Sequence, residues 1–522
     1  MNKKINNKST ISLIDHSVIV VKDVFKSVEY PTIKKWFILI FILSFSFQGC
    51  SSSSNYKSEI IQSIPEAWSV KVEEVETYTG NWWESFGDTT FTRYYDDFQS
   101  NSPDLKSIIS QSAMAKNSAK IIASSSFPNL NISASNSNRK QNLSAFGFSS
   151  SMLGLGDENN DPNENQDSNN NAQNSVVSFT SENSGLNVGM QWEVDIWGKL
   201  LNARRAAYKD YESTLNDLVY LKFSIGVQYV KAYYLAVESN VQYLLSIEMR
   251  EALDRIKNIV LSRYDTGLSS SLDLRLAESS LAISRVQEEN RLIQKSNAVR
   301  NLEILMGKYP SASLIVSETF PEEYPKIPAE LPVNLIERRP DIQAAINDVE
   351  ASGYRLAQSK RELLPAISLT TSAGTSSQDL KDILNGDYSI WNLATNVTAP
   401  LFQGGRLRAN VAMNKDQVSL AKINAMKKLL QAFSEVEQSL ATENSIERQY
   451  IAVLEAEEQS EAAYNLAVGR YEKGISDLIT VLNSQQQLFT AKSQKYSLQN
   501  QRIRARVNLF LALGGDFYVS KN

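Results

Sequence analysis

The sequence predicts a mainly α-helical protein with a smaller β part, built from two copies of one structural unit. Three observations support this fold class: the two halves carry matching motifs at equal spacing, two very long stretches lack proline, and short runs alternate apolar with polar residues. Self-similarity at a fixed spacing indicates a duplicated unit of secondary structure. We therefore expect each half to repeat the same order of helices and strands.

The N-terminus has the layout of a secretory signal peptide in residues 1–49. An apolar run, Trp36 to Leu43, follows two lysines and ends shortly before Cys50, the only cysteine of the chain. A lone cysteine at the end of such a segment resembles the lipidation site of bacterial lipoproteins, although Phe47 stands where an aliphatic residue is usual. We expect Cys50 to carry a lipid and 50–87 to be an N-terminal lipid-anchored segment; the alternative is a plain signal peptide cleaved nearby.

Composition argues against nucleic-acid binding and against most catalytic chemistry. The formal net charge is −5, and the single histidine, His16, lies within the predicted signal peptide. A mature chain without histidine or a free thiol lacks the usual general bases, thiol nucleophiles and transition-metal ligands. We therefore predict no enzyme activity, no cofactor and no metal site. Carboxylate-only chemistry stays open, but the acidic residues are scattered over helical faces.

The two halves align through prolines and glycines. Pro103 and Pro128 stand 25 residues apart, as do Pro340 and Pro365, and a spacing of 69 residues separates one glycine pair in each half. These glycine pairs are Gly198 with Gly267 and Gly405 with Gly474. The first copy contains 30 extra residues around the polar segment Asp157 to Asn174, which has too few apolar side chains to pack. We expect a solvated loop at about 136–184.

Four short runs alternate with a period of two. In Asn187 to Trp197, the apolar residues occupy one face and polar residues the other. The apolar sets are Val188, Met190, Trp192, Val194 and Ile196; Leu130, Ile132 and Ala134; Ile367, Leu369 and Ala373; and Leu393, Val397, Ala399 and Leu401. This pattern fits a soluble sandwich or an outer-membrane barrel, and the predicted secretion favours the barrel.

Between the strands the chain is predicted to form unusually long helices. Arg406 to Val468 contains no proline, and at about 1.5 Å per residue it would form a rod of roughly 95 Å. Gly267 and Gly474 are expected to turn each rod back into a hairpin. Arg338-Arg339, beside Pro340-Asp341 at a helix start, is expected to form an ion pair and a cap, with an anion site as the alternative.

These elements divide the chain into two repeats. The first is predicted over 88–309 and the second over 333–514, each with a helix, two strands and a long helical hairpin, joined by a Pro-rich linker at 310–332 and followed by a tail at 515–522. Four strands cannot close a membrane barrel, because the smallest closed barrels have about eight. Open strand edges in lipid are costly, so we expect chains to assemble.

Several motifs are specific enough to indicate a family. They are Arg338-Arg339-Pro340-Asp341-Ile342, Leu364-Pro365-Ala366, Pro400-Leu401-Phe402-Gln403-Gly404-Gly405, Trp192-Glu193-Val194-Asp195-Ile196-Trp197-Gly198, and the Arg-Tyr-x-x-Gly sequences that end at Gly267 and Gly474. From about Trp82 to Gly515 the chain resembles the TolC-type outer-membrane efflux ducts, in the lipoprotein branch that works with resistance-nodulation-division pumps.

The resemblance implies the assembly, the location and the function. It implies a homotrimer with a shared twelve-stranded outer-membrane barrel, an α-helical tunnel through the periplasm, and a tip that closes at the two hairpin turns. Its partners would be a periplasmic adaptor protein, an inner-membrane pump and outer-membrane lipid of a Gram-negative bacterium. The function would be efflux of small molecules through a tripartite system. The alternative is a secreted helical-hairpin adaptor or adhesin without a pore, which would show a single hairpin.

The resemblance also assigns roles at the hairpin tips. Adaptor docking is expected at Gly267, Leu268, Ser269, Gly474, Ile475 and Ser476. Counting from Gly474, the pore constriction falls at Ile479, Thr480 and Asn483, where relatives often carry a carboxylate and this chain carries none. A gate latch is expected between Asp273 and Tyr471, although the basic partner found in some members is Ser476 here.

Overall fold

The computed structural model describes residues 68, 86–147, 152, 178–322, 324 and 332–515. The predicted signal peptide and Cys50 lie outside these residues, as do most of the anchored segment, of the extra loop and of the tail, and part of the linker. No helix among the residues that the structure describes is both long enough and apolar enough to cross a membrane.

The predicted tandem repeat is confirmed by helices of equal length in the two halves. Paired helices have 22, 67 and 35 residues in both copies. The pairs are α5 (Pro103–Ser124) with α9 (Pro340–Arg361), α6 (Lys199–Asp265) with α10 (Arg406–Glu472), and α7 (Ser271–Leu305) with α11 (Leu478–Ala512). Short helices α4 (Thr89–Asn101) and α8 (Pro332–Arg338) precede α5 and α9, respectively.

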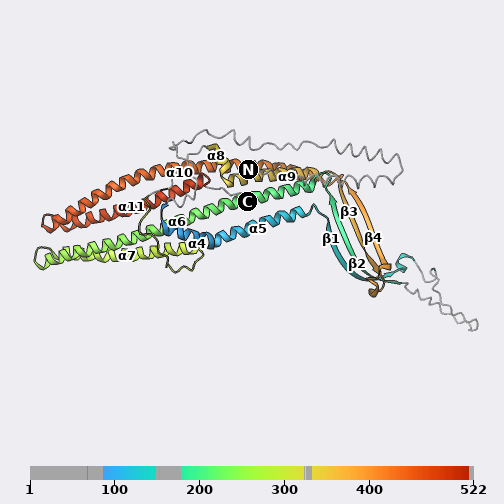
Figure 1. Cartoon of the computed structure of the whole chain (residues 1–522), viewed down its shortest axis with the longest axis horizontal. Helices are drawn as coiled ribbons and strands as arrows, with labels where there is room; N and C mark the ends of the chain where they lie inside the picture. The colour runs from blue at the N-terminus through green and yellow to red at the C-terminus, as the bar shows by residue number, and fades with distance from the viewer. Residues whose placement is uncertain are drawn as a thin grey trace, which may run out of the picture. The chain divides into compact units, whose positions relative to one another are not determined.

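Four strands form one antiparallel sheet in sequence order. They are β1 (Asn129–Asn142), β2 (Ser178–Val194), β3 (Ala366–Ser377) and β4 (Ser389–Thr398), with β1 and β4 at the edges. Single-turn helices η3 (Ser144–Phe146), η4 (Leu380–Asp382) and η5 (Gly386–Tyr388) lie in the connections. Figure 1 shows the strands together beyond the ends of the long helices.

The strand bounds differ from the prediction at both ends. Pairing continues to Asn142 and resumes at Ser178, so the expected loop at about 136–184 is too wide. The far half of β1 is polar and exposed on both faces, so its sequence shows no alternation of apolar and polar residues. Its backbone nevertheless continues to pair with β2. Ile196, Ala399 and Leu401 lie beyond the strands to which they were assigned.

The long helices form a layer with the same order as the strands. Helix α6 contacts α5 and α9, and α10 contacts α9, so that the order is α5, α6, α9, α10. Helix α7 packs along α6, and α11 packs along both α10 and α6. These two hairpins lie side by side in Figure 1. Each strand continues from the end of one helix of the layer, because the connections are only a few residues long.

The largest core lies where α4 crosses the middle of α6. Phe91, Tyr229, Tyr233 and Tyr234 are fully buried there, with the ring centroids of Phe91 and Tyr233 5.2 Å apart. Asp88 accepts a 2.7 Å hydrogen bond from the Tyr233 hydroxyl and also caps α4 through its other oxygen. Aromatic packing and one capped carboxylate thus fix α4 on the long helix.

In the second copy, a network of buried charged groups joins the start of α9 to α10 and to the end of α11. Arg339, 1% exposed, forms two hydrogen bonds with Asp341 at 3.0 and 2.9 Å, a third with Glu435 at 2.6 Å and a fourth with the Ala512 carbonyl at 3.1 Å. The expected Arg339–Asp341 ion pair is confirmed. Arg339 is the N-cap residue, but its side chain makes no capping bond.

Candidate functional site

The sheet has one apolar and one polar face, as the alternation predicted. Cross-strand pairs such as Ile132 with Val188 and Ile367 with Val397 lie on the apolar face. Within the chain this face is largely uncovered, since Ile132 is 71% and Val397 65% exposed. Apolar side chains in this pattern are stable only against lipid or another chain.

The opposite face is polar and nearly uncharged, and it leaves little room for larger residues at three positions. Asn131, Asn187, Ser372 and Asn392 are among its members. A Cβ at Gly374 would lie 2.0 Å from the Leu186 carbonyl oxygen, and Cβ atoms at Gly185 and Gly189 would also meet neighbouring strands within 3 Å. Glycine is therefore required at Gly185 and Gly374, where the obstructing atoms belong to the backbone, whereas at Gly189 the contact is with the Asn131 side chain.

The helix layer and the sheet both end in unpaired edges. Within the described part of the chain, helices α5 and α10 have no further neighbour in the layer, and each carries exposed apolar side chains along its length. These side chains are Ile109, Met114 and Ile121 on α5, and Met413, Leu420, Ile423 and Leu430 on α10. The strand that continues from each of these helices, β1 or β4, likewise has no partner on its outer side among the residues that the structure describes.

Each hairpin reverses at a glycine in the left-handed region. Gly267 has φ +76° and Gly474 φ +75°, a conformation that side chains rarely adopt. The next residues, Leu268 and Ile475, are 68% and 63% exposed. The structure thus has two apolar side chains at the turns, uncovered within the chain, where adaptor docking was predicted.

The predicted constriction residues lie on the exposed side of α11. Ile479, Thr480 and Asn483 are exposed, whereas Leu478 and Val481 are buried against the other hairpin. The helix starts at this point because the Asp477 side chain accepts a hydrogen bond from the Thr480 amide at 2.8 Å. The three positions therefore form one exposed stripe without charge.

Asp273 and Tyr471 do not bond to each other within the chain. Asp273 accepts hydrogen bonds from both Ser270 and Ser269 and completes the capping box of α7. Desolvation alone would raise the pKa of Asp273, but the hydrogen bonds from the serines hold the pKa below its usual value. The Tyr471 hydroxyl is buried and has no hydrogen-bond partner.

Arg263 joins the two tips instead, a contact that the sequence analysis missed. Its guanidinium lies 5.2 Å from the centre of the Tyr471 ring and donates a 3.1 Å hydrogen bond to the Glu472 carbonyl. Arg263 belongs to the Arg-Tyr-x-x-Gly motif of the first hairpin, and this was the available signal. Below it, Ile256, Ala277, Val481 and neighbours form an apolar cluster that all four hairpin helices share.

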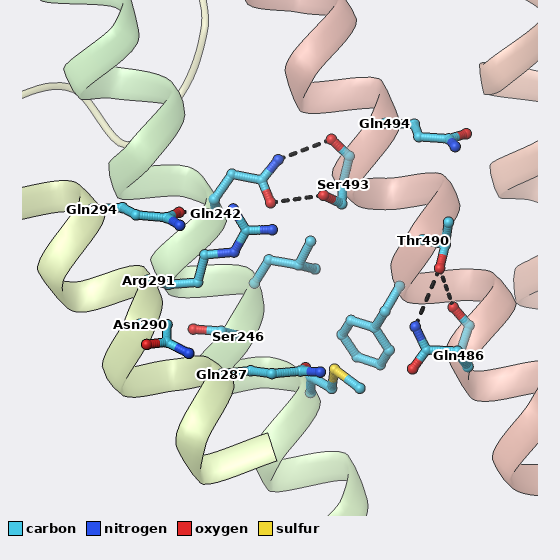
Figure 2. Close-up of a pocket in the computed structure, with 13 residues that line it drawn as sticks. Gln242, Ser246, Gln287, Asn290, Arg291, Gln294, Gln486, Thr490, Ser493 and Gln494 are labelled. Atoms are coloured by element: carbon cyan, nitrogen blue, oxygen red, sulfur yellow. Dashed lines mark hydrogen bonds between the residues drawn. The ribbon is translucent and has the colours of Figure 1, made fainter. Parts of the chain in front are cut away.

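A cavity of 440 Å³ with both polar and apolar lining residues lies between the hairpins, nearer their middle (Figure 2). Gln242 of α6 donates a 2.9 Å hydrogen bond to the Ser493 carbonyl, and the Ser493 hydroxyl donates one of 2.9 Å back to Gln242. Figure 2 shows Arg291 and Gln294 of α7 on the same side of the cavity as Gln242, and Thr490 of α11 across from them. At this level these amide and hydroxyl contacts connect the two hairpins beside a small apolar cluster of Leu245, Ala252 and Phe489. Within the described part of the chain, no three His, Cys, Asp or Glu residues are placed to hold a metal ion.

Comparison with known proteins gives one family match over most of the chain. The model of the family described as outer membrane efflux protein matches residues 94–308 and 331–515, that is, both repeats. A toluene efflux pump outer membrane protein of Pseudomonas putida, TtgF, is 28% identical over 330 residues, which cover 63% of this chain and 69% of the relative. The pyoverdine export outer membrane protein OpmQ of Pseudomonas aeruginosa is 27% identical over 442 residues, covering 84% and 87%.

Solved structures agree on the fold. The Campylobacter jejuni CmeC outer membrane channel superposes with a TM-score of 0.75 at 24% identity, covering 88% of this chain and 92% of CmeC. The Neisseria gonorrhoeae MtrE outer membrane channel, in its open state, gives a TM-score of 0.69 at 20% identity, covering 87% and 98%.

Proposed function

Because the chain belongs to the outer membrane efflux protein family, we propose that it is the outer-membrane channel of a tripartite efflux system. It passes small molecules from an inner-membrane pump and a periplasmic adaptor to the exterior. The observation that carries this proposal is the sheet with one uncovered apolar face and one nearly uncharged polar face, continued by a layer of long helices in the same order. The apolar face meets lipid and the polar face lines water.

The channel is a homotrimer in this proposal. One chain supplies four strands with two open edges, and three chains supply twelve, enough to close a barrel whose smallest known form has about eight. The exposed apolar residues of α5 and α10 lie on the outer helices of the layer, so a neighbouring chain would bury both stripes together with the open strand edges. Closing these edges in lipid removes unpaired backbone groups that each cost several kcal/mol.

The hairpin tips form the docking surface and the gate. Leu268 and Ile475 are the apolar anchors for the adaptor, and their exposure supports this role. Ile479, Thr480 and Asn483 of three chains form the constriction. Asp273 and Tyr471 of neighbouring coiled coils form the latch, which requires the Tyr471 hydroxyl to leave its buried position. Cys50 carries a lipid, and the protein is a channel without enzymatic activity.

Conductance of the full-length protein in planar lipid bilayers tests the channel directly. A channel gives discrete steps of ion current, whereas an adaptor or adhesin without a pore gives none. Leu268→Asp and Ile475→Asp test docking, because a buried anchor tolerates no charge. Each should abolish export while the amount of trimer in the membrane and the conductance stay unchanged. Loss of the trimer would instead show that these side chains stabilise the assembly.

A further inference from the structure

Basic residues gather where the four helices of the layer meet the sheet. The eleven residues nearest the sheet in α5, α6, α9 and α10 contain twelve Lys or Arg and one acidic residue, Asp416. The basic residues are Lys116, Lys120, Lys199, Arg204, Arg205, Lys209, Arg355, Lys360, Arg361, Arg406, Arg408 and Lys415. We call this set the cationic belt. The next eleven residues of the same helices carry three basic and seven acidic residues, so the charge reverses within one short segment.

Helix capping does not explain the cationic belt. Cations stabilise the C-terminal ends of helices, which accounts for Lys360 and Arg361 in the last turn of α9, but α5 has no basic residue in its last turn and cations are unfavourable at N-terminal ends. Helices α6 and α10 begin at the sheet with Lys199 and with Arg406 and Arg408, and neither has an acidic residue in its first turn. Lys199, Arg406 and Arg408 therefore oppose the helix dipole.

Most of the belt also lacks internal neutralisation. Lys199 pairs with Glu193 at 2.5 Å, Lys209 with Glu212 at 2.7 Å, and Arg355 with Asp210. Within the described residues, the nine other belt cations form no ion pair with a carboxylate. Arg204, Arg205 and Lys209, with Tyr208 and Tyr354, line a cavity of 310 Å³ that is open to solvent.

The cationic belt lies next to the apolar surface of the sheet, with exposed apolar residues between the two. Between strands and helices, Phe127, Ile196, Trp197, Leu401 and Phe402 are all exposed. An apolar face, then large aromatic and aliphatic residues, then cations is the order of a membrane core, its interface and its headgroups. Basic residues beside a membrane surface are attracted to anionic lipids.

We propose that the cationic belt binds the phosphate headgroups of anionic phospholipids in the leaflet next to the helices. Charge complementarity and continuity with the apolar face support this ligand class. The cavity at Arg204 and Arg205 accommodates one headgroup, with Tyr208 and Tyr354 beside its glycerol region. The inference rests on the proposed position of the sheet in the membrane.

The test compares lipid retention by full-length protein reconstituted in vesicles of equal phosphatidylglycerol and phosphatidylcholine. After extraction in detergent, bound lipids are quantified by native mass spectrometry. The variant Arg204→Gln/Arg205→Gln/Lys360→Gln removes belt cations from α6 and α9, the inner helices of the layer. The control Arg285→Gln/Lys427→Gln/Arg448→Gln removes the same charge from exposed positions farther from the sheet.

The wild type and the control should retain phosphatidylglycerol over phosphatidylcholine, and the belt variant should lose this preference by about fivefold per cation removed. An unchanged lipid ratio in the belt variant overturns the proposal. If the reversal potential for an anionic solute changes while the lipid ratio does not, the cations face the duct rather than the lipid, and the proposal is likewise overturned. Absence of conductance in the wild type would contradict the proposed function instead, and this is measured on the same vesicles.

Discussion

Exchanging Arg263 for glutamine should loosen the contact between the two hairpin tips and raise the open population of the proposed gate. The wild-type side chain contributes a cation–π contact at 5.2 Å and a hydrogen bond to the Glu472 carbonyl at 3.1 Å. Such contacts stabilise by about 0.5–2 and about 1.5–3 kcal/mol respectively. Because Arg263 is only half-buried, the lower part of both ranges applies, and together they give about 2–3 kcal/mol. That free energy corresponds to roughly a 30- to 140-fold change in the closed-to-open equilibrium.

The assay is the open fraction of single channels of the full-length protein in planar bilayers. Arg470→Gln is the matched control, because Arg470 is the repeat-equivalent residue, exposed and without an ion pair among the described residues. An equal effect of both substitutions, or no effect of Arg263→Gln, would refute the reasoning. Tyr471→Phe should leave the open fraction unchanged if Arg263 alone closes the tip. If Tyr471→Phe and Asp273→Ala each raise it, with little further effect together, the latch between chains is the dominant contact.

Three further predictions concern stability, selectivity and the anchor. Arg339→Met should lower the free energy of unfolding by about 3–5 kcal/mol, because it leaves Asp341 buried with Lys428 as its remaining ion-pair partner; denaturant melts of the solubilised protein measure this. Burial alone would raise the pKa of Asp341, but Arg339 and Lys428 hold this pKa below its usual value. The stability that ionised Asp341 contributes is therefore fully present above the ordinary carboxyl pKa of 3.8, and it is lost as the pH falls through the lower pKa of the folded protein. Reversal potentials in a salt gradient should show weak cation preference, since a threefold ring of the constriction residues holds no charge, and strong preference would place the constriction elsewhere. Palmitate labelling should be lost in Cys50→Ser, with the protein still inserted in the membrane, and label retained on the variant would exclude Cys50 as the lipid site.

The repeat and the hairpins were predictable because they depend on local chemistry. Glycine at Gly267 and Gly474 supplies a left-handed turn, and the absence of proline allows the 67-residue helix that precedes each turn. The Arg339–Asp341 pair was predictable for the same reason, since the two residues are neighbours in the chain. The open sheet with two distinct faces followed from a period of two.

The features that could not be predicted from the sequence depend on contacts between residues far apart in the chain. The far half of β1 pairs with β2 although both of its faces are polar, and side-chain periodicity cannot report backbone pairing of this kind. Arg263 and Tyr471 lie far apart in the chain and meet only because two hairpins pack together. Burial of the Tyr471 hydroxyl could not be foreseen either, because it depends on residues from the opposite hairpin.

The two open edges of the sheet make the stability of one chain a matter of mass action. A subunit that exposes unpaired strands and two apolar stripes gains most of its protection from its neighbours, so its apparent stability rises with its concentration in the membrane. A substitution that disrupts one edge would also affect the neighbouring chains of the same assembly. In the proposed trimer, equal expression of intact and edge-defective chains would leave about one assembly in eight free of a defective subunit, which makes such variants dominant.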